Sequence, residues 1–273
     1  MTPNHQQEHY GRDYDYSKGS PHLRYQHLYE SLTGRIKLEV EQATEPGRTA
    51  EVLEIGAGDG SVTTRLLELG YSVTGTEMSE DSVAAMKSRF SGNEGFRALL
   101  DAEGDLEVLG GDRFNAVLFA SVLHHIPDYL ASLKLVTENH LEPGASLISI
   151  QDPLWYPRQS RFTNLTTRLA YLSWRVTQGE FLRGVKTRLG RLRRGISEES
   201  AGDVIEYHVV RDGVDELAIS EQLKADFESV EIHRYWSSQG PPQQWLGERL
   251  GLVNTFAIFA SGYRPQDQNS PAG

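Results

Sequence analysis

Three closely spaced glycines and one downstream carboxylate form the clearest chemical pattern in the sequence. Residues 52–60 read VLEIGAGDG, so a short apolar run leads directly into Gly56, Gly58 and Gly60. Glycines at such a turn let the backbone approach a ligand closely, because no Cβ intrudes. Glu77 follows 21 residues after Gly56, at the end of a second apolar run, where a carboxylate can hold the two hydroxyls of a ribose. These residues predict a nucleoside cofactor site.

The residues around the glycines favour one nucleoside cofactor over another. A dinucleotide pyrophosphate prefers the spacing G-x-G-x-x-G, in which the last glycine lets helix and strand pack closely. Here Ser61 stands at that position, and the third glycine comes one residue earlier. Glu54 precedes the first glycine by two residues and offers an acceptor to an ammonium group. S-adenosylmethionine carries an ammonium and no phosphate, so the pattern favours it, and a nicotinamide dehydrogenase is the disfavoured alternative.

Strand and helix patterns alternate along most of the chain. Apolar runs predict strands at 51–55, 71–76, 96–100, 116–123, 145–150, 230–236 and 255–261. Amphipathic spacing predicts helices at 23–40, 61–69, 80–90, 128–140, 162–176 and 219–227. We therefore expect an α/β fold with a doubly wound, Rossmann-like, mostly parallel seven-stranded sheet and helices on both faces. The last two strands are candidates for antiparallel pairing at the sheet edge.

The same patterns predict a division into four parts. They are an N-terminal arm and helix at 1–45, an α/β domain at 46–152 and 203–264, a helical insertion after the fifth strand at 153–202, and a flexible tail at 265–273. The segment 158–194 has ten Lys and Arg and one acid, a net charge of +9 that leaves −20 for the rest of the chain. A charge split of this size marks a distinct element.

The insertion begins with an amphipathic pattern that several functions would explain. Apolar residues recur at 3-4-3-4 spacing, and arginines recur every seven residues on a neighbouring stripe, at Arg161, Arg168 and Arg175. The apolar positions are Phe162, Leu165, Leu169, Leu172 and Val176. A helical lid over an acceptor, a dimer surface, and a contact with RNA or an anionic membrane remain open, and core packing explains some of the apolar residues equally well.

Composition narrows the class of protein. The chain has no cysteine, which excludes disulfides and thiolate metal ligands, and we expect no metal site. The net charge of −11 argues against general nucleic-acid affinity. The polar N-terminus does not resemble a signal peptide, and no apolar run approaches the ~20 residues that span a bilayer, so we expect a cytoplasmic protein.

Five segments between Glu51 and Ile150 together resemble class I S-adenosylmethionine-dependent methyltransferases. They read VLEIGAGDG, TGTEMS, LLDAEG, NAVLFASVLHHIPD and LEPGASLISI. The stretch GSPHL at 19–23 and the residues around His125 also resemble bacterial small-molecule methyltransferases of natural-product pathways. Enzymes that methylate exocyclic base nitrogens carry Asn/Asp-Pro-Pro-Tyr after the fourth strand; SVLH stands there instead, which argues against a DNA base as acceptor.

The resemblance implies a role for each strand end in binding S-adenosylmethionine. The methionine end would be held by Glu54 and the loop residues Gly56, Ala57, Gly58 and Gly60. Glu77 would bind the ribose hydroxyls, and Met78 would pack on the adenine. Asp101 and the backbone of Ala102 would contact the adenine amino group, and Ala120 and Ser121 the amino-acid part.

Three histidines are candidates for a catalytic base, because histidine titrates near working pH. His124 and His125 follow the fourth strand, at the carboxyl edge where α/β sheets bind ligands. Either could instead cap the next helix or pack under the cofactor; the resemblance assigns His125 to that second role and leaves His124 as the better base. His208 could face the acceptor or belong to an ordinary strand, and Asp152 could lie near the transferred methyl group or cap a turn.

These observations predict an enzyme that transfers a methyl group from S-adenosylmethionine to a nitrogen or oxygen of a small molecule, in the manner of antibiotic-type tailoring of a secondary metabolite. A homodimer is possible. The alternative from another class is an RNA-binding methyltransferase-like protein, or an RNA methyltransferase, that uses the arginines of 158–194.

Overall fold

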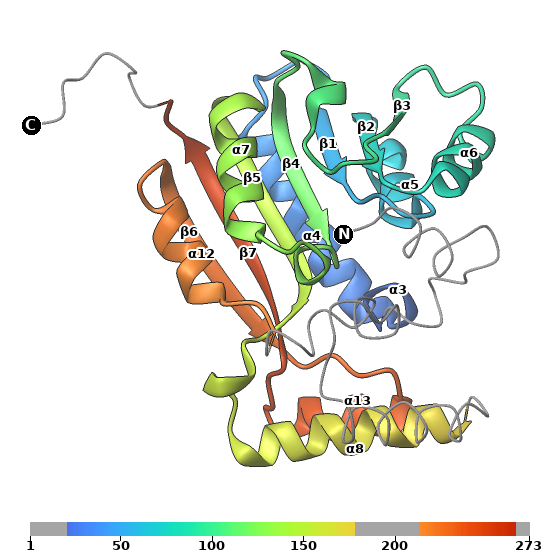
Figure 1. The fold of residues 1–273 in the computed structure, drawn as a ribbon, viewed down its shortest axis with the longest axis vertical. Coiled ribbons are helices and arrows are strands. Elements are labelled where there is room, and N and C mark those ends of the chain that lie inside the picture. The colour runs from blue at the N-terminus through green and yellow to red at the C-terminus, as the bar shows by residue number, and fades with distance from the viewer. Residues whose placement is uncertain (1–20, 178–212, 266–273) are drawn as a thin grey trace, which may run out of the picture.

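Seven strands form one sheet at the centre of the protein, as the sequence predicts. The structure is a computed structural model that describes residues 21–177 and 213–265 (Figure 1). The strands are β1 (Glu51–Ile55), β2 (Ser72–Glu77), β3 (Phe96–Leu100), β4 (Phe114–Ala120), β5 (Leu141–Pro153), β6 (Phe227–Tyr235) and β7 (Thr255–Tyr263). Their order is β3-β2-β1-β4-β5-β7-β6. This is the doubly wound, Rossmann-like α/β architecture.

All pairings from β3 to β5 are parallel, and the antiparallel strand lies inside the sheet. Strand β7 pairs antiparallel with β5 on one side and with β6 on the other, so β6 is the edge strand and β7 is not. The sequence predicts antiparallel pairing of the last two strands at the edge, but it does not predict which of them lies next to β5. Since β6 and β7 come last in the chain, only the hydrogen bonds between strands reveal which of them meets β5.

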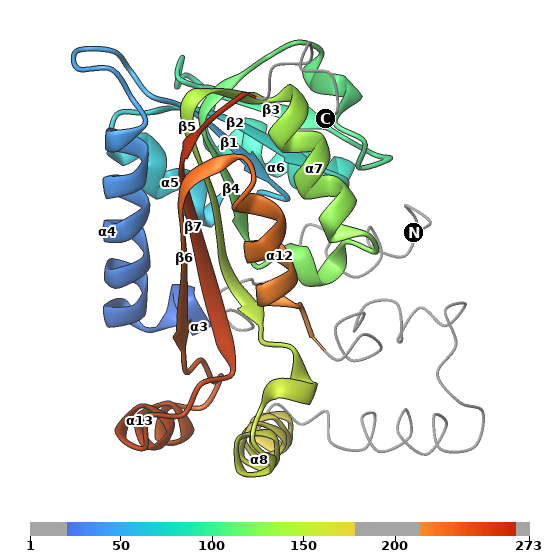
Figure 2. The same cartoon turned by 90° about the vertical axis from the view of Figure 1, so that its left-hand side faces the viewer.

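Side chains of alternate residues face opposite sides of the sheet, which explains why the strands are apolar throughout. In β4, Ala116 and Leu118 pack against α4 (Gln26–Gln42) and α5 (Ser61–Glu68). Their neighbours Val117 and Phe119 pack on the other face, against α7 (Tyr129–Asn139) and α12 (Glu216–Leu223). Figure 2 shows these helix pairs on the two sides of the sheet. Helix α6 (Glu80–Arg89) covers a smaller cluster beside β3.

Capping side chains define where several helices begin. The Ser79 hydroxyl accepts a hydrogen bond from the Ser82 amide at the start of α6, as its sequence position suggested. Asp128 caps α7 in the same way, and Asp215 caps α12 through the amides of Leu217 and Ala218. The predicted helix at 219–227 is therefore displaced: the helix starts at Glu216, and Phe227 already belongs to β6.

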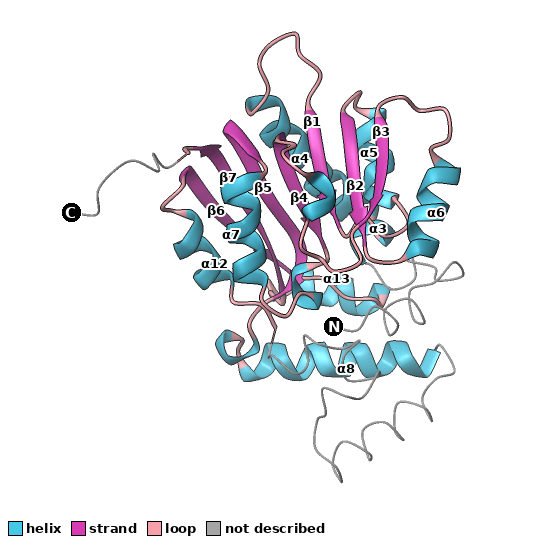
Figure 3. Ribbon diagram, turned by 45° about the horizontal axis from the view of Figure 1, so that its top comes forward, coloured by secondary structure: helices cyan, strands magenta, loops and turns pink. Residues whose placement is uncertain are grey.

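The remaining helices lie at the carboxyl end of the parallel strands or connect elements. They are α3 (Pro21–Arg24), α8 (Arg161–Thr177) and α13 (Pro241–Arg249), with 3-10 turns η1 (Glu107–Leu109), η2 (Leu123–His125) and η3 (Tyr156–Arg158). The sequence patterns did not predict α13. Figure 3 shows α8 and α13 at the same end of the molecule. Within the described residues, no helix is long and apolar enough to cross a bilayer.

The two sides of the predicted insertion meet at the sheet. Leu154, just after β5, forms a bridge with Val214, and the Val214 amide donates a hydrogen bond of 3.0 Å to the Pro153 carbonyl. The division into four parts stays a prediction, because its boundary at 202–203 lies outside the described residues.

Candidate active site

The glycine loop between β1 and α5 has a backbone conformation that residues with side chains would rarely adopt. Gly56, Gly58 and Gly60 have φ of +66°, +57° and +77°, in the left-handed region. A Cβ on Gly56 would come within 2.7 Å of the Val122 side chain, and one on Gly60 within 2.6 Å of the Phe90 ring. The glycines therefore let the loop backbone pack directly against neighbouring side chains. Among the backbone hydrogen bonds that hold it, the Ala57 amide donates to the Thr76 carbonyl of β2 at 3.0 Å.

Glu77 ties the loop to the end of β2. Its carboxylate accepts hydrogen bonds from the amides of Gly58 at 3.0 Å, Met78 at 2.8 Å and Ser79 at 3.2 Å. Burial raises the pKa of Glu77; the three amides oppose that rise, and the nearby charge of Asp101 adds to it. These hydrogen bonds fix the orientation of the Glu77 carboxylate and hold it beside the glycine loop.

Glu54 lies beneath the same loop. The side chain is buried, with 1% of the residue exposed, and it accepts a hydrogen bond of 2.5 Å from the Thr63 hydroxyl of α5. Burial raises the pKa of Glu54 to about 8, and the charges of Asp59 and Glu77 push it in the same direction. In this structure the carboxylate of Glu54 contacts Thr63. Its contact with the methionine group of the cofactor stays a prediction.

Asp101 follows β3 at the same edge. It is buried, and its carboxylate accepts a hydrogen bond of 3.2 Å from the Gly104 amide, so it also orders the following loop. Burial raises its pKa, with a further rise from Asp105. Met78 lies beside this loop, since its sulfur would be 4.0 Å from a Cβ on Gly104. Two of the residues expected around an adenine are therefore neighbours. Ala102, the third, directly follows Asp101 and is half-buried.

These three acids fit a cationic nucleoside ligand. The charge of Glu77 raises the pKa of Glu54, and the charge of Asp101 raises the pKa of Glu77, because like charges in a low dielectric repel. A ligand that brings an ammonium or sulfonium group would relieve that cost, and one with phosphates would increase it. The donor set thus suits S-adenosylmethionine better than a dinucleotide.

The next two strand ends carry unusual backbone conformations. Ser121, directly after Ala120 and β4, has φ of +61°, and Gln151 in β5 has φ of +67°. The Ser121 amide donates a 2.8 Å hydrogen bond to the Ile150 carbonyl. Non-glycine residues with such angles are uncommon, and they concentrate where a chain must present particular groups to a ligand.

His124 and Asp152 form a buried pair at this edge. The Nδ1 atom of His124 lies 2.7 Å from Asp152 Oδ1, and its backbone amide donates to the same oxygen at 3.2 Å. The Ser149 hydroxyl donates to the other carboxylate oxygen at 2.8 Å. Asp152 is fully buried, which raises its pKa to about 7 in spite of these donors. A carboxylate at Nδ1 favours the tautomer with the proton there, which makes Nε2 the basic nitrogen of the ring.

His125 is adjacent to the pair, with its ring centroid 4.0 Å from that of His124. Its charge, when protonated, lowers the pKa of Asp152. His208, the third predicted base, lies outside the described residues.

Sequence reasoning missed the pairing of His124 with Asp152. Each residue was singled out separately, although a signal was available: both follow predicted strands, at 116–123 and 145–150, and these strands pair as neighbours, with Ala120 opposite Ile150. Residues just beyond the carboxyl ends of paired parallel strands must lie close together. Ser149 carried no such signal, because only the bend after Ile150 brings its hydroxyl to Asp152.

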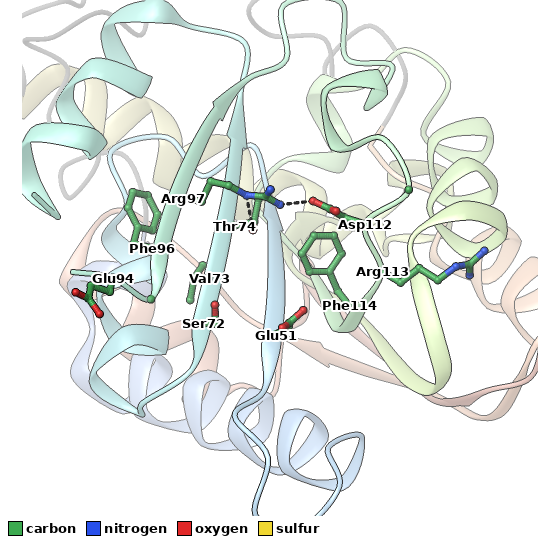
Figure 4. A pocket seen from close by; sticks show the side chains of 12 residues that line it. Glu51, Ser72, Val73, Thr74, Glu94, Phe96, Arg97, Asp112, Arg113 and Phe114 are labelled. Carbon is green, nitrogen blue, oxygen red and sulfur yellow. Dashed lines mark hydrogen bonds and ion pairs between the residues drawn. The ribbon is translucent and has the colours of Figure 1, made fainter. Parts of the chain in front are cut away.

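One sizeable hollow lies away from all these residues. A depression of about 550 Å³ opens at the amino ends of β1 to β4 (Figure 4). Arg97 spans it, bonded to Thr74 and ion-paired with Asp112 at 2.5 Å. The glycine loop and Glu77 lie at the opposite edge of the sheet, so we do not assign this depression to the cofactor.

Comparison with known proteins agrees with the geometry. Residues 53–147 match the family described as "Methyltransferase domain". The CurJ carbon methyltransferase superposes with a TM-score of 0.54 at 15% identity, over 90% of this chain and 59% of that chain. The N-methyltransferase NodS from Bradyrhizobium japonicum WM9, in complex with S-adenosyl-L-homocysteine, superposes with a TM-score of 0.52 at 14% identity, over 96% and 99% of the two chains.

A third similar structure is described by the conversion of a disulfide bond into a thioacetal group during echinomycin biosynthesis. It superposes with a TM-score of 0.53 at 17% identity, over 98% of this chain and 92% of that chain. At these identities the likeness concerns the fold. No curated protein matches the sequence.

Proposed function

We propose that this chain, a class I S-adenosylmethionine-dependent methyltransferase, methylates a nitrogen or an oxygen of a small molecule, as in the tailoring of a secondary metabolite. The similar structures include proteins named as carbon and as nitrogen methyltransferases, so the fold by itself does not select the acceptor atom. The observation that supports the proposal is the pairing of His124 with Asp152 at the carboxyl edge.

The proposed cofactor contacts follow the strand ends. Glu77 would bind the ribose hydroxyls, and Met78, Asp101 and Ala102 would surround the adenine. The methionine end would lie against the loop, with Ala120 and Ser121 beside it; these residues are Gly56, Ala57, Gly58 and Gly60, above the buried Glu54. When bound, S-adenosylmethionine supplies a methyl group on a positively charged sulfur. A cation there matches acids whose ionised forms the fold otherwise disfavours.

His124 would act as the base for an acceptor that must lose a proton. Asp152 holds the Nδ1 proton of His124, so Nε2 can take the proton from an acceptor hydroxyl or N–H while the new bond to carbon forms. Since a thioether is a neutral leaving group, no residue of this site would need to act as an acid toward the donor. His125 and His208 remain candidates for contacts with the same acceptor. A neutral amine could attack without this base. The pairing of His124 with Asp152 therefore favours a hydroxyl acceptor over an amine.

The alternative RNA function draws less support from the described residues. Arg158, the first arginine of the basic segment, donates to Asp215 and to the buried Glu216, and its guanidinium lies 4.6 Å from the Trp155 ring centroid. An arginine held in this way is not free to bind phosphate.

Incubation of the protein with isotopically labelled S-adenosylmethionine and fractionated cell extract tests the proposal. We expect label in the small-molecule fraction, detected by mass spectrometry, and none in the RNA fraction. Label in RNA would contradict the proposal and favour the alternative.

A further inference from the structure

Three residues of the predicted apolar stripe are exposed in the part of helix α8 whose side chains the structure describes. Phe162, Leu165 and Leu169 are 58%, 56% and 57% exposed, whereas the buried positions are Thr163 and Ala170. A helix that packs on a soluble domain normally has the reverse arrangement, with apolar residues inward. Core packing, one of the sequence-based explanations, therefore does not account for these three side chains.

Helix α13 adds apolar side chains at the same end of the molecule. Trp245 is 61% exposed, and Leu246 and Leu250 are exposed as well. Figures 1 and 2 show α8 and α13 below the carboxyl ends of the parallel strands, the end that also carries the glycine loop. Single exposed apolar residues are common on protein surfaces, but a group of six on two helices indicates an interaction surface.

The base of α8 is anchored to the sheet. Arg158, three residues before the helix, donates to Glu216 at 3.0 Å, and Arg234 of β6 donates to the other oxygen of the same carboxylate at 3.1 Å. Glu216 is buried, so these ion pairs are held in place more firmly than surface pairs. These ion pairs tie the segment just before α8 to α12 and β6.

The charge of α8 indicates what the stripe contacts. The helix contains three arginines at seven-residue spacing and no acid, although the whole chain has a net charge of −11. Arg161 is exposed, and on α13 the Arg249 guanidinium lies 5.6 Å from the centroid of the exposed Trp245 ring. Helices with Phe, Leu and Trp on one face and arginines beside it lie in the interface of membranes that contain anionic lipids. RNA would engage the arginines but would leave the leucines in water.

We propose that α8 and α13 form a docking surface for an anionic phospholipid bilayer. The exposed apolar side chains of the two helices enter the boundary between headgroups and acyl chains, and Arg161 and Arg249 contact the headgroup phosphates. The carboxyl edge of the sheet then faces the membrane. If the proposed methyltransferase function holds, its acceptor is an amphipathic molecule that reaches His124 from the lipid surface.

Vesicle co-sedimentation of the full chain, without cofactor, tests the docking surface independently of catalysis. Vesicles of phosphatidylcholine with phosphatidylglycerol should bind the protein, and vesicles of phosphatidylcholine alone should bind it at least about tenfold more weakly. Added salt should weaken binding to the anionic vesicles, because it screens the arginines. The triple variant Phe162→Ser, Leu165→Ser, Leu169→Ser should lose at least about tenfold in affinity.

Leu38→Ser is the matched control, since Leu38 is 53% exposed on α4, on a face of the sheet away from α8. It should bind vesicles as the wild type does. Equal binding by the triple variant, or no sedimentation of the wild type with anionic vesicles, would overturn the proposal. So would a stable dimer that the triple variant dissociates, because a second copy would then cover the stripe.

Discussion

The charged groups at the two ends of the parallel strands differ in burial and in pairing. At the carboxyl ends, Glu54, Glu77, Asp101 and Asp152 are withdrawn from water, and burial raises the pKa of each. At the amino ends, Asp112 is about half exposed and pairs with the similarly exposed Arg97 beside an open depression (Figure 4). Ionising the buried acids at the carboxyl ends costs free energy, and a cationic ligand could reduce that cost. The ion pair at the amino ends is already neutral overall and solvated.

This difference indicates which end is functional. Perturbed acids gather where a protein binds or reacts with a ligand, whereas exposed ion pairs contribute little to stability or chemistry. A hollow without such groups is weak evidence for a site, even when it is large. Substitutions at the carboxyl ends should therefore change function or stability more than matched substitutions elsewhere.

His124→Asn should have the largest effect, a loss of about 10²–10⁴-fold in kcat, because it removes the proposed base. The measurement is turnover of labelled methyl donor with a hydroxyl acceptor. His233→Asn, at an exposed position on β6, is the control and should leave kcat unchanged. Unchanged turnover in His124→Asn would mean that the acceptor needs no base from this residue.

Asp152→Asn should lower kcat by about 10- to 100-fold, because His124 loses the partner that fixes its tautomer. The wild-type rate should fall as the pH drops below about 7, where Asp152 takes up a proton. The pH profile of kcat in the variant should differ from the wild type in that limb, because His124 is then the only titrating group of the pair, while KM changes little. A variant with the wild-type profile would show that Asp152 does not act through His124.

Gly56→Ala should destabilise the fold by about 1–3 kcal/mol, since φ is positive and the Val122 side chain blocks the new Cβ. Gly111→Ala at the amino end has nothing within 4 Å of its Cβ and should change stability by less than about 0.5 kcal/mol. Urea unfolding of both variants measures the difference. Equal stability would contradict the close packing of the loop.

Glu54→Gln should change the slope of stability with pH. The folded pKa of Glu54 is raised from 4.5 to about 8, so the folded protein keeps a proton that the unfolded chain releases. The free energy of unfolding contributed by this group therefore falls as the pH rises from 4.5 to about 8. Thermal midpoints across that range should decline less in the variant than in the wild type. Identical slopes would show that Glu54 is ionised in the folded state throughout.

The strands of the sheet and the glycine loop could be predicted from the sequence. Contacts between segments that are distant in the chain could not. Apolar runs and glycine spacing are local, so β1, the loop after Ile55 and the position of Glu77 follow from residues near one another. The position of β7 between β5 and β6 depends on pairing between distant segments. Periodicity located the stripe of Phe162 and Leu165, but a helix pattern does not say which side faces the protein.

The most direct test of the account is calorimetric binding of S-adenosylhomocysteine to Glu77→Ala and Asp112→Ala. Both variants remove one carboxylate, from opposite ends of the same strands. We expect Glu77→Ala to weaken binding by about 10- to 100-fold, since hydrogen bonds to a charged group are lost, and Asp112→Ala to bind as the wild type does. Binding that is weakened by Asp112→Ala and untouched by Glu77→Ala would place the cofactor at the amino ends and contradict the account.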